Sequence, residues 1–320
     1  FLTMKQRNLL IDVLKGFTII LVVMGHASQW FSGDDRSNPF YVTIYAFHMP
    51  LFMFLSGYVC YNNRGEINLF KRFQVLVIPF VWFFISLAFH KEIIYPNIVI
   101  EKLLILLKNP AKGMWFLWLL FWQCVLLYLA LKINKQREVF VLIGLWSILI
   151  FIHRILGAPI PFYGLSDLCW YLLYFTIGYV LHKYEPIAIK VIRPAGWCSF
   201  IIFPTLLFIT IDPTENLFYA LRLYCLALSG TFASYVFWEW ITQRNSLLKR
   251  CLVYLGGISL EIYVTHYYFR FLKQYITKYI GDNFYINVIV FTALAILGCV
   301  LTELLIRRIK PLRRILYGRF

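Results

Sequence analysis

The sequence predicts an all-α fold, a polytopic bundle of about ten transmembrane helices with both termini in the cytoplasm. Of its 320 residues, 61% are hydrophobic and only 14% are charged, whereas a soluble domain carries about 25% charged residues. Most of the apolar residues form runs of roughly 17 to 25 residues, the length that crosses about 30 Å of hydrocarbon. Positive charge recurs between alternate runs, which is the pattern of cytoplasmic loops in a multi-pass protein.

Apolar runs separated by polar breaks give ten predicted spans, which are Leu9–Phe31, Val42–Tyr61, Phe73–His90, Met114–Leu131, Val139–His153, Asp167–His182, Val191–Ile211, Asn216–Ile241, Leu252–Leu272 and Phe284–Ile306. The apolar piece from Ile98 to Leu107 is too short to span and contains Glu101 and Lys102, so we expect it at the membrane interface. The sequence has no Pro/Gly/Ser-rich linker and no convincing internal repeat. One transmembrane domain over residues 1–320 is the simplest prediction.

The formal net charge of +16 could reflect either nucleic-acid binding or membrane topology. With a cytoplasmic N-terminus, the inside segments hold 20 of the 31 Lys and Arg residues, 14 of them before the tail and six after Ile306. Nine fall outside, and Lys15 and Arg222 lie within spans. This asymmetry is the positive-inside pattern, so we expect membrane lipid and no nucleic acid as a partner.

The seven cysteines are scattered singly among apolar residues, with no CxxC pair. That spacing is typical of small buried hydrophobic side chains, and we expect no metal site.

The first span carries the densest set of polar residues, Asp12, Lys15 and His26 within IDVLKGFTIILVVMGHA. Ionisable groups are expensive inside a membrane and are candidates for function. The step of eleven residues from Lys15 to His26 is close to whole helical turns, so both face the same way, about 16 Å apart along the axis. His26 suits general-base chemistry, and Lys15 is a point charge suited to phosphate. Alternatively, Lys15 extends to the interface and His26 is a hydrogen-bonded packing residue.

Other polar residues in or beside the spans are weaker candidates. His48 could orient His26 or a substrate hydroxyl, or be structural, and Arg72 could contact an anion or only contribute positive-inside charge. The later candidates are Trp115, Arg222, Glu261 and His266. Arg222 and Glu261 sit well inside apolar stretches, so each needs a partner or lines a wet cavity, and an ion pair between them is an alternative.

Six pieces of sequence carry a family resemblance: IDVLKGFTIILVVMGHA, FHMPLFMFLSGY, a basic pair before Pro79 (Lys71 and Arg72), WFLWLLF, WYLLYFTIGY and GGISLEIYVTH. In this order, over nearly the whole chain, they resemble the acyltransferase-3 family of integral membrane O-acyltransferases, which modify bacterial surface sugars. Members typically carry a basic residue, usually Arg, eleven positions before an essential histidine. Here that pair is Lys15 and His26, and lysine keeps the charge but not bidentate phosphate recognition.

The resemblance implies a multi-pass acyltransferase of the bacterial inner membrane. It implies acyl-CoA, usually acetyl-CoA, as the donor substrate on the cytoplasmic side, a glycan hydroxyl as the acceptor, and no bound cofactor. We assign His26, Asp12 and His48 to the catalytic centre, Lys15 and Arg72 to the donor, and Trp115, Arg222, Glu261 and His266 to the acceptor. A covalent acyl-histidine relay stays open, as do succinyl in place of acetyl and the oligomeric state. The alternative function is a transporter or flippase of a lipid-linked sugar or polysaccharide.

Overall fold

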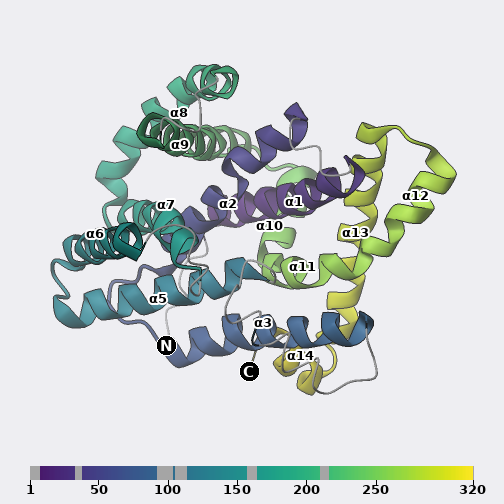
Figure 1. Ribbon diagram of the computed structural model, residues 1–320, viewed down its shortest axis with the longest axis horizontal. Helices are drawn as coiled ribbons and strands as arrows, with labels where there is room; N and C mark the ends of the chain where they lie inside the picture. Colours follow the sequence, from purple (N-terminus) through teal and green to yellow (C-terminus); the bar gives the residue numbers. More distant parts are fainter. Residues whose placement is uncertain are drawn as a thin grey trace. The chain divides into compact units, whose positions relative to one another are not determined.

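The computed structural model describes residues 8–32, 38–91, 104, 114–156, 164–209 and 216–319. Every regular element within these ranges is helical, as predicted (Figure 1). The helices are α1 (Leu9–Phe31), α2 (Pro39–Cys60), α3 (Leu69–Lys91), α5 (Trp115–Ile133), α6 (Glu138–Leu156), α7 (Leu165–Lys183), α8 (Glu185–Phe208), α9 (Asn216–Thr242), α10 (Leu247–Gly257), α11 (Ser259–Thr265), η2 (His266–Phe271), α12 (Leu272–Ile280), α13 (Phe284–Ile306) and α14 (Lys310–Tyr317).

Six helices in the described part of the chain are long and apolar enough to cross a membrane, namely α1, α2, α5, α8, α9 and α13. A shorter apolar helix covers Glu138–His153. These helices make the chain a membrane protein, while the predicted number of ten spans and the position of the termini stay predictions. The predicted interfacial segment Ile98–Leu107 lies outside the described residues, apart from Leu104.

The predicted ninth span, Leu252–Leu272, is not one continuous helix. The chain there forms α10, α11 and the 3₁₀ helix η2, and Ile258 separates the first two with φ −114° and ψ 21°. Gly256 and Gly257 end α10, where their low helix propensity favours a break. Hydropathy alone could not reveal this division, because Gly256, Gly257 and Ile258 at the break carry no polar side chain.

The described contacts divide the chain into two compact units. The first comprises Phe1–Leu55 and Glu185–Glu303. In this unit α1 packs against α9, α10 and α11, and α8 lies beside α9 (Figure 1).

A close crossing of α1 and α10 organises the first unit. A Cβ atom on Gly256 would lie 1.9 Å from the carbonyl oxygen of Asp12, and one on Gly16 would lie 2.1 Å from that of Leu252. Small residues allow two helix backbones to approach in this way. The crossing fixes the N-terminal half of α1, where Asp12 and Lys15 are found.

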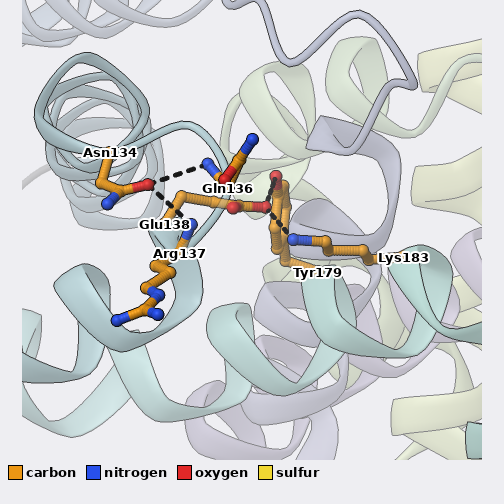
Figure 2. Close-up of polar contacts among 6 residues, drawn as sticks. All are labelled: Asn134, Gln136, Arg137, Glu138, Tyr179 and Lys183. Atoms are coloured by element: carbon orange, nitrogen blue, oxygen red, sulfur yellow. Dashed lines mark hydrogen bonds and ion pairs between the residues drawn. The ribbon is translucent and has the colours of Figure 1, made fainter.

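The second unit comprises Ser56–Tyr184 and Leu304–Phe320. Here α5 packs against α3, α6 and α7, and α14 packs on α3. The carboxylate of Glu138, only 2% exposed, joins α6 to α7 by accepting hydrogen bonds from Lys183 Nζ at 2.6 Å and the Tyr179 hydroxyl at 3.0 Å (Figure 2). Next to it, Asn134 Oδ1 accepts from the backbone N–H groups of Gln136 and Arg137 and shapes the α5–α6 turn.

Candidate active site

The imidazole of His26 lies near the C-terminal end of α1, within a cluster of aromatic side chains. The hydroxyl of Tyr267 is 3.2 Å from His26 Nε2 and 3.3 Å from Nδ1. The ring of His266 stacks on that of His26 with 5.2 Å between centroids, and Trp30 stacks at 6.0 Å. His26 itself is partly exposed, whereas its neighbours Gly25 and Ala27 are buried. His26 is therefore more accessible than the residues on either side of it in α1.

His266 supports His26 from a fully buried position, with 0% of its surface exposed. Its Nδ1 lies 3.2 Å from the carbonyl oxygen of Ile262. A carbonyl only accepts hydrogen bonds, so Nδ1 carries the proton and Nε2 keeps a lone pair when the ring is neutral. Within the described part of the chain Nε2 has no hydrogen-bond partner. His266 thus contacts the predicted base and not an open space.

Helix α2 contributes a third histidine to the first unit. His48 is 3% exposed, its Nδ1 lies 2.7 Å from the carbonyl oxygen of Ile44, and its ring packs edge-on against Tyr45 at 4.8 Å. The Tyr45 hydroxyl lies 3.4 Å from Oε1 of Gln29, which follows His26 by one helical turn. His48 is thus linked to the His26–His266 pair through Tyr45 and Gln29, and these three histidines from α1, α2 and η2 are called the histidine cluster.

Lys15 and Asp12 occupy the other half of α1. Asp12 is 7% exposed, and Lys15 is partly exposed between the buried residues Leu14 and Gly16. The helix is uninterrupted from Leu9 to Phe31, so the predicted placement of Lys15 and His26 on one face agrees with the structure.

Two predicted residues, Arg72 and Trp115, belong to the second unit. Arg72 is partly exposed in the first turn of α3. The ring of Trp115, at the start of α5, packs on Tyr171 at 5.1 Å.

Arg222 and Glu261 both lie in the first unit. The hydrogen bonds of Arg222 are made with backbone carbonyl groups. Arg222 donates hydrogen bonds from Nε and Nη2 to the carbonyl oxygens of Leu206 and Leu207 in α8. These carbonyl groups hold the guanidinium, so Glu261 is not needed to explain its place in an apolar helix. Glu261 is 2% exposed in the first turn of α11.

The chain was compared with known proteins. The sequence profile of the family described as "Acyltransferase domain" (Acyl_transf_3) matches residues 8–307. The chain belongs to this acyltransferase family. Nodulation protein NolL of Mesorhizobium japonicum is 26% identical to this chain over 211 residues. The match covers 62% of this chain and 51% of that protein. Nodulation protein NolL of Sinorhizobium fredii is 44% identical over 59 residues, or 17% of this chain and 16% of that protein.

This acyltransferase-family chain spans about half the length of the M. japonicum relative that it matches. No solved structure is significantly similar to it. The two units and the histidine cluster therefore rest on the geometry of this chain alone.

Two further residues of this family member, Tyr267 and Gln123, have notable surroundings in the structure and were not predicted from the sequence. Tyr267, which contacts His26, stands in an aromatic end of the predicted ninth span that is also typical of an interfacial belt. Gln123 of α5 is 0% exposed, and its amide nitrogen and oxygen have no partner among the described residues. A glutamine inside an apolar run was a signal in the sequence that could have singled out Gln123. The described residues include no group of three potential metal ligands.

Proposed function

We propose that this protein transfers an acyl group, acetyl in the simplest case, from acyl-CoA to a hydroxyl of a cell-surface or lipid-linked glycan. The family of the chain supports acyl transfer. The observation that carries the assignment of the base is the partly exposed ring of His26, held between the buried ring of His266 and the hydroxyl of Tyr267.

In the proposed reaction a ring nitrogen of His26 removes the proton of the glycan hydroxyl. The hydroxyl oxygen then attacks the thioester carbonyl carbon, the carbon–sulfur bond breaks, and CoA leaves as a thiolate that takes up the proton. General-base help of this kind contributes about 10²- to 10⁴-fold to the rate. The Tyr267 hydroxyl and the stacked His266 ring hold the His26 ring in place, and His48 is linked to α1 through Tyr45 and Gln29.

The donor and acceptor contacts follow the sequence assignment. Lys15 holds phosphate groups of the donor, and Asp12 shares the buried stretch of α1 beside Lys15. Arg72, which the sequence also assigns to the donor, belongs to the second unit. Trp115, Arg222, Glu261 and His266 were assigned to the acceptor. Of these, the contacts of Arg222 with carbonyl groups and the burial of His266 support positioning roles. The protein works in the bacterial inner membrane with ten spans and cytoplasmic termini.

A thiol-release assay tests this proposal. Purified protein in detergent receives acetyl-CoA and an envelope glycan extract, and the released CoA thiol is measured with a chromogenic thiol reagent. Cys198, Cys225 and Cys251 are exposed and would also react. The His26→Gln variant, which carries the same cysteines, gives the matched background.

We expect acceptor-dependent thiol release above that background. Thiol release that is equal in the native and His26→Gln proteins would contradict the proposed base. An absence of release with acetyl-CoA and with succinyl-CoA would contradict acyl-CoA as the donor.

A further inference from the structure

A row of positive charge lies directly beside the histidine cluster. Between Arg270 and Gly281 the sequence reads RFLKQYITKYIG, with three cations and no acidic residue. Arg270, Lys273, Gln274, Thr277 and Lys278 line a groove of about 550 Å³ together with Phe271. The spacing of these polar residues, three, four, seven and eight positions after Arg270, places them on one helical face.

The opposite face of the same segment anchors it to the protein. Ile276 of α12 is 4% exposed, and Phe269 of η2 packs against Gly298 of α13, where an added Cβ would lie 2.3 Å from its ring. The cationic face is therefore held in a fixed orientation by packing behind it.

The groove adjoins the ring of His26 through contacts on α1. The guanidinium carbon of Arg270 lies 5.5 Å from the ring centroid of Trp30, and Lys273 Nζ lies 5.9 Å from that of Phe31. Trp30 stacks on His26 and also meets Tyr267 at 5.7 Å. A ligand that lies in the groove can thus extend one hydroxyl to His26.

The predicted topology does not explain the positive charge of Arg270, Lys273 and Lys278. On the predicted topology this segment faces the outside, where positive-inside sorting depletes Lys and Arg. Arg270 and Lys278 are exposed, and no carboxylate pairs with Arg270, Lys273 or Lys278 among the described residues. Three unneutralised cations next to a reacting group attract an anion.

We propose that the acceptor is an acidic glycan, whose carboxylate or phosphate binds Arg270, Lys273 and Lys278 while a neighbouring hydroxyl reaches His26. This inference rests on the proposed function. The amide of Gln274 and the hydroxyl of Thr277 lie between the cations and supply hydrogen bonds for the sugar. The anion belongs to the glycan and not to bulk lipid, because Arg270 contacts Trp30, whose ring stacks on that of His26.

A charge-neutral variant tests the groove. In Arg270→Gln/Lys273→Gln/Lys278→Gln, the KM for the extracted glycan should rise about tenfold or more, since hydrogen bonds to charged groups are the strong ones. The KM for acetyl-CoA and thiol release into water without acceptor should stay unchanged. The matched control, Arg307→Gln/Arg308→Gln/Lys310→Gln, removes equal charge from exposed positions and should keep the native glycan KM. All assays use uncharged detergent and are run both without and with added anionic lipid.

The acylated glycan itself gives the second readout. Mass spectrometry of the product should place the acyl group on a repeat unit that carries a carboxylate or a phosphate. A neutral repeat unit, or a glycan KM in the groove variant within about twofold of the control, would overturn the acidic acceptor while leaving acyl transfer intact. A higher glycan KM in the groove variant that is seen with anionic lipid and disappears without it would assign the groove to lipid headgroups. Absence of acyl transfer by the native protein would instead contradict the proposed function.

Discussion

At the scale of residues, the chemistry depends on which histidine carries the reacting nitrogen. His26 is partly exposed and touches the Tyr267 hydroxyl, whereas His266 is fully buried and hydrogen-bonded through Nδ1. We expect His26→Gln to lose at least about 10²-fold in acyl-transfer rate, because an amide cannot accept a proton near neutral pH. His266→Gln should keep partial activity, since it acts through packing. Initial rates on both purified variants check this.

One outcome of these rate measurements would contradict the assignment of His26 as the base. A near-native rate for His26→Gln combined with an inactive His266→Gln would move the base to η2. Both variants must elute as a single monodisperse species in detergent, so that a folding defect is not taken for a loss of chemistry.

Lys15 gives a second prediction at this scale. If Lys15 binds donor phosphate, Lys15→Ala should raise the KM for acyl-CoA by about tenfold, while Lys15→Arg keeps the charge and most of the activity. Steady-state kinetics with acetyl-CoA as the varied substrate distinguish the two. An equal loss in both variants with unchanged donor affinity would indicate a structural role.

At the scale of elements, the crossing of α1 and α10 holds Asp12 and Lys15 in place. Gly256→Ala would bring a methyl group to 1.9 Å from the Asp12 carbonyl oxygen, so the helices must separate. Overpacking of this kind costs about 1–3 kcal/mol, and the unfolding temperature in detergent should fall. Gly144→Ala in α6 is the matched control, because nothing lies within 4 Å of its added Cβ. That change should be neutral or stabilising, since alanine favours helix. An equal response of both variants would contradict the close crossing.

Sequence patterns predicted the bounds of single helices better than the breaks within a span or the contacts between helices. The bounds Leu9–Phe31 and Phe284–Ile306 were predicted as the structure has them, because each predominantly apolar run is flanked by polar residues at both ends. The break after Gly257 and the change to 3₁₀ geometry at His266 were missed, since hydropathy sums composition and does not detect a change in backbone geometry. The contact of His26 with Tyr267 joins residues 241 positions apart, and no local pattern encodes such a pairing.

At the scale of the whole molecule, the predicted topology follows from the distribution of charge. With the exposed cysteines Cys198, Cys225 and Cys251 replaced by alanine, single cysteines at Asn63 and Gln136 should resist an impermeant thiol reagent in intact cells. Cysteines at Asn38 and Asp282 should react. The inverse labelling pattern would reverse the orientation, and reaction at all four positions would contradict the span assignment.

The central claim is that His26 of this chain transfers an acyl group to a surface glycan. The most direct test is the glycan mass in three otherwise identical strains, which carry the native gene, no gene, or His26→Gln produced at the native level in the membrane. We expect the native strain alone to carry the added acyl mass, 42 Da being the increment that would identify acetyl, with the other two strains alike. The same added mass in the His26→Gln strain, or in the strain without the gene, would contradict the claim.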